Sequence, residues 1–269
     1  MKPNLVPTEN SFPTLCSSIV VYKDSTQIVS VLGGDVFLRR AAGDWQKATA
    51  GLPHQTFVNR LKLDGDRLFA CTNKGLFLFD RDTWRSTDVN VPCYTYTSAH
   101  GYCFAATEYG IWCGAARTWA KTDISDQTVY DVMFCSQFIF FGHPHGISMY
   151  DRYTDQWAHF AVEHGVTSLA MKCGIVLGTT SRGELVQSDG HGGFQTVGLK
   201  HMFIYSLIRK GIALFACTDR GLFQIRLFQG RVTLFSIQVG YPVTDVDLIE
   251  DEIVMATLFQ GIQSKKMIY

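Results

Sequence analysis

The sequence Leu-Phe-Ala-Cys-Thr-Asn-Lys-Gly-Leu-Phe at residues 68–77 returns almost unchanged as Leu-Phe-Ala-Cys-Thr-Asp-Arg-Gly-Leu-Phe at residues 214–223. Each copy is an apolar run that ends in Thr, turns through Gly and resumes as a second apolar run, a pattern typical of a β-hairpin. Looser copies bring the number of repeats to seven. The repeats lie at residues 29–34, 69–75, 104–110, 140–146, 176–183, 215–221 and 254–261.

The period of this repeat decides the fold class. Its central position recurs every 35 to 40 residues, at Leu32, Thr72, Thr107, His143, Thr179, Thr218 and Thr257. Units of that length accommodate four short strands, whereas helical repeats of similar period would show apolar residues at a 3.6-residue spacing, which is absent here. The sequence therefore predicts an all-β fold, a seven-bladed β-propeller with four-stranded blades.

The repeat leaves no room for a second domain, so we expect one propeller domain over residues 1–269. After Thr257 only one more strand remains, and the N-terminal strand is therefore expected to complete the final blade and close the ring. The predicted blades are residues 12–50, 54–90, 92–124, 126–162, 164–198, 201–239 and 241–269 completed by 1–10.

Charge and hydropathy narrow the classes of partner. The chain has 24 basic and 24 acidic residues and no basic run, which argues against a nucleic-acid partner. No segment approaches about 18 apolar residues, and the N-terminus lacks the apolar stretch of a signal peptide, so we expect no membrane partner and a cytoplasmic location. The 8 cysteines form no Cys-x-x-Cys motif and are expected to be free thiols.

A longer stretch carries a family resemblance. Leu-Asp-Gly-Asp-Arg-Leu-Phe-Ala-Cys-Thr-Asn-Lys-Gly-Leu-Phe-Leu-Phe-Asp at residues 63–80, repeated in looser form at residues 212–225, resembles the repeats of two-component-regulator and photosystem-assembly-factor propellers, which are similar to BNR repeats. The resemblance implies the propeller fold. It implies no particular reaction, because such families share blades and not chemistry.

The face at which the inner strands begin is the expected functional face. Loops before the inner strands and turns after the second strands meet at that end of the channel, and loops often carry function. Solvation alone also explains polar residues in loops, so both interpretations stay open. The ligand-binding candidates are His54, Tyr96, Glu108, Tyr109, Tyr130, His164, His201, Tyr205, Tyr241 and Asp245.

His143 stands where most other repeats have Thr, and it leads the catalytic candidates. If the hairpin turns near residues 135–137, Asp131 lies on the same face one diagonal step away and would orient an acid–base imidazole. Arg60, on another inner strand, would then stabilise developing negative charge. The alternative is a His143 that is buried between blades and satisfied by a hydrogen bond without any catalytic role.

Two further sets of residues bear on ligand binding. His143 and His145 could share a metal ion, although a zinc site needs three or four ligands, and no other cofactor is indicated. The inner strands are also expected to place a polar ring in the channel, which would either bind a polar ligand or form ion pairs. The expected ring is Ser17, Arg60, Ser98, Asp131, Ser168, Ser206 and Asp245.

These observations favour a non-enzymatic binding module that holds a small molecule or a protein loop at one channel face. The alternative is a small-molecule enzyme, a lyase, isomerase or cyclase, with His143 as its acid or base. Seven equivalent sugar sites are disfavoured, because the polar residues differ from repeat to repeat.

Overall fold

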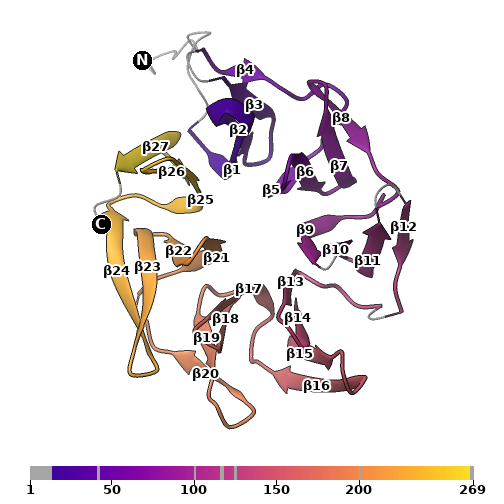
Figure 1. Cartoon of the computed structure of the whole chain (residues 1–269). Helices are drawn as coiled ribbons and strands as arrows, with labels where there is room; N and C mark the ends of the chain where they lie inside the picture. Colours follow the sequence, from indigo (N-terminus) through magenta and orange to yellow (C-terminus); the bar gives the residue numbers. More distant parts are fainter. Residues whose placement is uncertain are drawn as a thin grey trace, which may run out of the picture.

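The computed structural model describes residues 14–40, 43–99, 101–115, 118–123, 126–199 and 201–266. Within these ranges the chain forms seven antiparallel sheets, arranged as blades around a central channel (Figure 1). The predicted all-β, seven-bladed propeller is therefore confirmed. Within the same ranges, no helix has the length and apolar character needed to cross a membrane.

Six of the described sheets have four strands, and the seventh has three. Blade 1 consists of β1 (Cys16–Tyr22), β2 (Thr26–Val31), β3 (Val36–Arg39) and β4 (Gln46–Lys47). Blade 2 consists of β5 (Val58–Asp64), β6 (Arg67–Thr72), β7 (Gly75–Asp80) and β8 (Thr83–Ser86). Blade 3 consists of β9 (Cys93–Ala99), β10 (Tyr102–Thr107), β11 (Gly110–Ala115) and β12 (Thr118–Lys121). A short 3-10 turn, η1 (Lys23–Ser25), joins β1 to β2.

Blade 4 consists of β13 (Asp131–Phe134), β14 (Phe138–His143), β15 (Gly146–Asp151) and β16 (Gln156–Ala161). Blade 5 consists of β17 (Val166–Lys172), β18 (Ile175–Thr180), β19 (Leu185–Ser188) and β20 (Phe194–Val197). Blade 6 consists of β21 (Ile204–Lys210), β22 (Ala213–Thr218), β23 (Gly221–Phe228) and β24 (Arg231–Val239). Blade 7 has β25 (Val243–Ile249), β26 (Glu252–Thr257) and β27 (Ile262–Lys266). The N-terminal strand predicted to complete blade 7 falls in residues 1–13, outside the described ranges, and that closure stays a prediction.

The hydrophobic core is divided among the boundaries between blades. Ile28 of blade 1 packs against Leu68 and Trp84 of blade 2, and all three are buried. Cys16 and Ile19 of blade 1 pack against Val254 of blade 7, so buried contacts also join the last blade to the first. Burial of apolar surface between every pair of neighbouring blades stabilises the ring, because no blade covers both of its faces alone.

The repeated Thr and Gly have a shared structural role in the turn between the second and third strands. Thr72 is fully buried, and its hydroxyl donates to the Gly75 carbonyl at 2.8 Å and accepts from the Lys74 amide at 3.0 Å. Gly75 has a φ of +128°, and a Cβ there would lie 2.2 Å from the Val89 carbonyl oxygen. The turn therefore needs a short hydroxyl side chain at one position and glycine at the other.

Strand register corrects two of the predicted repeat positions by one residue. Val58 pairs with Thr72, and the corresponding pairs are Cys16 with Val31 in blade 1 and Val166 with Thr180 in blade 5. Val31 and Thr180 therefore take the place expected for Leu32 and Thr179. The apolar pattern of these two blades allowed either alignment, and the hydrogen-bonded pairing decides between them.

Replacing a repeat Thr should lower the free energy of unfolding. Thr218 is fully buried, and its hydroxyl donates to the Gly221 carbonyl at 2.8 Å and accepts from the Arg220 amide at 3.1 Å. Thr218→Val leaves both groups without that partner, so we expect a loss of about 1–3 kcal/mol in urea denaturation. Thr233→Val, at an exposed position of the same blade, is the control and should change stability little. Equal effects of the two substitutions would contradict this role.

Candidate functional site

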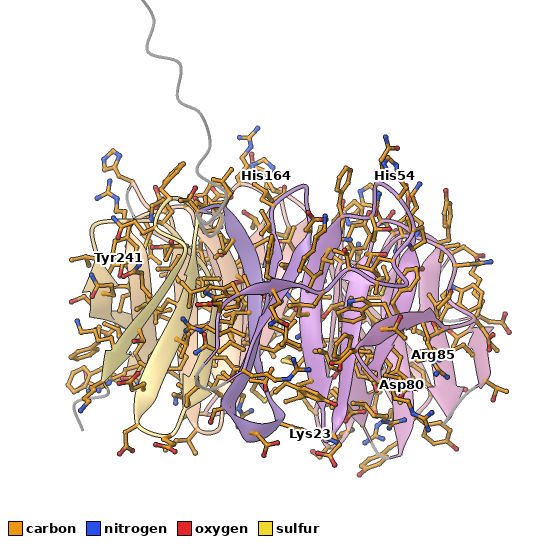
Figure 2. The ribbon with its side chains drawn as sticks, turned by 90° about the horizontal axis from the view of Figure 1, so that it is seen from above. Lys23, His54, Asp80, Arg85, His164 and Tyr241 are labelled. Carbon is orange, nitrogen blue, oxygen red and sulfur yellow. The ribbon has the colours of Figure 1, made fainter. Side chains whose placement is uncertain are left out.

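A central cavity of about 620 Å³ is bordered by the inner strands of all seven blades. Its lining runs from Arg60 in β5 and Asp131 in β13 toward Ser136 and Lys210 at the far ends of the inner strands. The cavity therefore lies on the side of the hairpins that join first and second strands. In Figure 2 this side carries Lys23, whereas the predicted functional face carries His54 and His164. The main cavity is not at the predicted face.

A β-bulge near the start of the inner strands determines which side chains form the polar ring. The register shifts by one residue between Val58 and Arg60, and equivalent shifts occur in blades 1, 5, 6 and 7. After the bulge, Ser18 rather than Ser17 pairs with the second strand, and Thr95 rather than Ser98 takes this place in blade 3. The ring residues are Ser18, Arg60, Thr95, Asp131, Ser168, Ser206 and Asp245. The predicted ring was wrong at Ser17, which is one residue out of register, and at Ser98, because the inner strand of blade 3 begins at Cys93, earlier than expected.

Five of these residues fasten one blade to the next. Ser18 and Ser168 accept hydrogen bonds from the amides of Leu61 and Leu207, each at 3.1 Å. Ser206 donates to the carbonyl of Thr244 at 3.2 Å. These hydroxyls satisfy backbone groups at the inner edge of a neighbouring blade, which has no further strand to pair with.

The two ring carboxylates make the same kind of contact. Asp131 accepts from the Leu169 amide of blade 5 at 2.7 Å and from its neighbour Val132 at 2.9 Å. Asp245 accepts from the Ile19 amide of blade 1 at 3.1 Å and from the Ser18 hydroxyl. Burial raises the pKa of Asp131, while Lys62 and Arg60 act in the opposite direction. Both aspartates hold neighbouring blades together through backbone amides, a role that neither predicted alternative, ligand binding or channel ion pairs, included.

Arg60 and Thr95 depart from this pattern. Neither the Arg60 guanidinium nor the ammonium of Lys62 makes a hydrogen bond or ion pair with another described residue, although both border the cavity. Burial, followed by the charge of Arg60, lowers the pKa of Lys62. Thr95 is 2% exposed, and its hydroxyl is a buried group without a partner among the described residues. The cavity therefore presents donors at this point that the protein itself does not satisfy.

His143 belongs to a separate chain of hydrogen bonds. Its Nδ1 accepts from the His145 amide at 3.2 Å, and its Nε2 lies 2.9 Å from the Ser148 hydroxyl, which lies 2.8 Å from Nδ1 of His159. Because Nδ1 of His143 is an acceptor, the neutral ring carries its proton on Nε2 and donates to Ser148. Ser148 in turn donates to His159. Nδ1 of His143 therefore has the same role as the hydroxyl of the repeat Thr. The Thr107 hydroxyl, for example, accepts a hydrogen bond from the amide two residues further along the chain.

The predicted pairing of His143 with Asp131 is wrong. Asp131 is opposite Gly142 in the sheet, and the extra residue, Tyr130, precedes it. The carboxylate therefore turns to the channel and blade 5, while His143 lies with Ser148 and His159 beside another cavity, of about 260 Å³. Arg60 borders the central cavity and not this one. The three catalytic candidates are not assembled into one site.

The geometry gives the metal hypothesis no support. Both ring nitrogens of His143 already take part in hydrogen bonds, and the ring centres of His143 and His145 are 6.3 Å apart. Among the described residues, no group of three or more His, Cys, Asp or Glu side chains is arranged to hold a metal ion. A zinc site would need at least three such ligands.

Tyr96 belongs to the core and also borders the central cavity, and it does not lie in a loop at the predicted face. It is 2% exposed, its ring stacks on Phe69 with centroids 4.1 Å apart, and its hydroxyl donates to Asp64 at 2.6 Å. Burial and the hydrogen bond to Asp64 raise the pKa of this hydroxyl. Tyr96 was predicted to lie in the loop before the inner strand, but β9 begins at Cys93 and Tyr96 therefore lies within the strand.

The other ligand-binding candidates are dispersed, with one cluster. Tyr130 meets Tyr94 edge to face at 5.2 Å, and burial raises the pKa of Tyr94, with contributions from Glu108 and Tyr109. Tyr94 was not among the sequence-predicted candidates. The remaining candidates are spread over blades 2, 5, 6 and 7: His54 and His201 are exposed, His164 is half-buried, Tyr205 packs against Phe203, and Tyr241 is half-buried.

Comparison with known proteins supports the propeller fold but identifies no family. No family model and no curated protein matches the chain. The extracellular domain of a putative one-component system from B. thetaiotaomicron is similar in structure, with a TM-score of 0.72 and 16% identity over 93% of this chain. The chain spans 38% of the length of that domain. At this identity the likeness concerns the propeller fold alone.

Two smaller proteins align over nearly their whole length. Virginiamycin B lyase from Staphylococcus aureus has a TM-score of 0.70 and 10% identity, covering 95% of this chain and 96% of its own. The WD40 propeller domain of Doa1 has a TM-score of 0.69 and 12% identity, covering 93% and 92%. An enzyme and a WD40 domain thus share this architecture, and the chemistry must be argued from the site.

The environment of His143 predicts a pH dependence of stability. Burial, followed by the charges of His145 and His159, lowers the pKa of His143 below its ordinary 6.5. The unfolded chain therefore binds this proton more readily, so the free energy of unfolding should fall as the pH drops below about 6.5 and be unaffected by this group above it. His143→Thr should reduce this acid sensitivity in urea denaturation, and His54→Gln, at an exposed position, should not. An unchanged acid sensitivity in His143→Thr would contradict the assignment.

Proposed function

We propose that the protein is a binding module that holds a small molecule in its central cavity, on the hairpin side of the propeller. The observation that carries this proposal is the 620 Å³ cavity with two cationic side chains, Arg60 and Lys62, that have no hydrogen-bonding partner among the described residues. Ligand pockets of soluble proteins commonly measure about 300–1,000 Å³ and contain a few convergent polar groups. The cavity meets both criteria.

Structural neighbours are compatible with this proposal without specifying it. The propeller architecture occurs in a WD40 domain and in a mitotic checkpoint complex, as well as in a lyase. A protein loop is therefore the other candidate occupant of the channel. The position of the cavity between seven inner strands favours a small molecule, because small-molecule sites are typically concave.

An enzyme remains the second candidate, on the evidence of the hydrogen-bond chain through Ser148. The Ser148 hydroxyl donates to Nδ1 of His159, which is exposed at the mouth of the 260 Å³ cavity. A positioned base beside a hydroxyl is one requirement of acid–base chemistry. Conversion of a bound compound by the wild type, lost in Ser148→Ala, would favour the enzyme. Binding without conversion favours the module.

A native cysteine reports on the central cavity. Cys135 borders it and is partly buried, whereas Cys173 is exposed and outside it. A compound that occupies the cavity should slow alkylation of Cys135 by iodoacetamide and leave the rate at Cys173 unchanged, measured by peptide mass spectrometry.

The screen for such compounds uses ligand-observed NMR on a library of neutral, cationic and anionic metabolites. Hits that shield Cys135 support the proposed function. If every confirmed hit leaves the alkylation rate of Cys135 unchanged, the central cavity is not the binding site and the proposal fails.

A further inference from the structure

We propose that the ligand carries a carboxylate or phosphate group, and that Arg60, Lys62 and Thr95 hold this group between blades 2 and 3. This inference rests on the proposed function and specifies the chemistry of the same cavity. All three residues border the central cavity, on the neighbouring inner strands β5 and β9.

The location follows from the interruption of the ring. In five blades the ring side chain bonds to the backbone of the next inner strand, as Ser168 does to Leu207. The two exceptions, Arg60 and Thr95, are in consecutive blades. Between these blades a different contact makes the connection, from the Asn59 side-chain amide to the Cys93 carbonyl at 2.7 Å. Arg60 therefore does not join its blade to the next one, unlike the ring residues of five other blades.

The balance of donors and acceptors identifies the chemistry of the ligand. Arg60 offers up to five N–H donors, Lys62 three and Thr95 one, and none has an acceptor among the described residues. A ligand that satisfies them must supply several acceptor oxygens within a small volume. Carboxylate and phosphate groups do so, and their hydrogen bonds to charged donors are stronger and shorter than those of neutral acceptors.

The nearby carboxylates do not fill this role. Asp131 and Asp245 accept backbone amides from blades 5 and 1, so their oxygens are already engaged. Neither carboxylate is within 4.0 Å of the nitrogens of Arg60 or Lys62, as no ion pair between them exists in the described structure. They moderate the positive charge at a distance while leaving the donors available. At the cavity mouth Lys210 is likewise engaged, in an ion pair with Asp247 at 2.6 Å.

Thr95 separates a binding role from a structural role more clearly than Arg60 or Lys62 does. A buried hydroxyl without a partner destabilises the fold, because it has lost its hydrogen bonds to water and gained none in return. A structural Thr in this repeat is bonded, as Thr107 is to the Gly110 carbonyl at 2.7 Å. An oxygen of the bound group would satisfy the Thr95 hydroxyl. Thr95→Val should therefore keep or raise the melting temperature of the free protein while it weakens binding.

The test compares anions with their uncharged esters. Citrate and inorganic phosphate are titrated against the full chain, at low ionic strength in a buffer without other oxyanions, with trimethyl citrate and trimethyl phosphate as matched neutral probes. Shielding of Cys135 from iodoacetamide reports occupancy. The variants are Arg60→Gln, Lys62→Gln and Thr95→Val. Arg85→Gln, at an exposed outer position (Figure 2), is the control with the same change in net charge.

The expected result is that citrate, phosphate or both shield Cys135 in the wild type and in Arg85→Gln, and that the esters do not. Affinity should fall about tenfold or more in Arg60→Gln and Lys62→Gln, and less in Thr95→Val. Melting temperatures show whether each variant is folded. Should Arg60→Gln fail to fold, the opposite effects of Thr95→Val on melting temperature and affinity still decide the matter.

Four outcomes would overturn the inference. Equal shielding by esters and anions, or wild-type affinity in Arg60→Gln, would show that charge recognition at this place is absent. If neutral metabolites from the screen shield Cys135 and anions do not, the binding module stands and the oxyanion site falls. If neither anions nor any screened compound shields Cys135, the proposed function falls as well.

Discussion

The bulge near the start of the inner strands is the constraint on which the rest of the structure depends. One extra residue turns the next side chain away from its own sheet and toward the backbone of the following blade. Inner strands are edge strands, with backbone groups that no further strand can pair. Ser and Asp side chains satisfy those groups, and the bond from Asp245 to Ile19 carries the same contact from blade 7 to blade 1.

This arrangement separates structural polarity from polarity available for binding. Asp131 and Asp245 would attract attention as buried acids in a channel, yet both are occupied in joining blades. Burial of a polar group with a partner is the rule in proteins and carries little functional information. The informative residues are those whose partners are missing, Arg60 and Thr95. Their place beside each other reflects a single interruption of an otherwise repeated contact.

His143 illustrates how a departure from a repeat can preserve the structural role of the residue it replaces. Thr72 and Thr107 each accept the backbone amide two residues ahead, and His143 does the same through Nδ1. The larger ring then reaches Ser148, which the shorter threonine does not. The prediction that blade 4 differs chemically was sound, but the partner was misidentified, because a one-residue bulge at Tyr130 reverses the side on which Asp131 lies.

The sequence alone determined the number of blades, their hairpins and the need for Thr and Gly in the turns. Each of these depends on local physics: alternating burial along a strand, the positive φ of Gly75, and a hydroxyl that bonds within its own turn. Tertiary structure decided the members of the ring, the side on which the cavity lies and the separation of His143 from Asp131 and Arg60. These features depend on bulges and on contacts between blades about 40 residues apart, and a bulge adds a residue without leaving a distinctive local pattern.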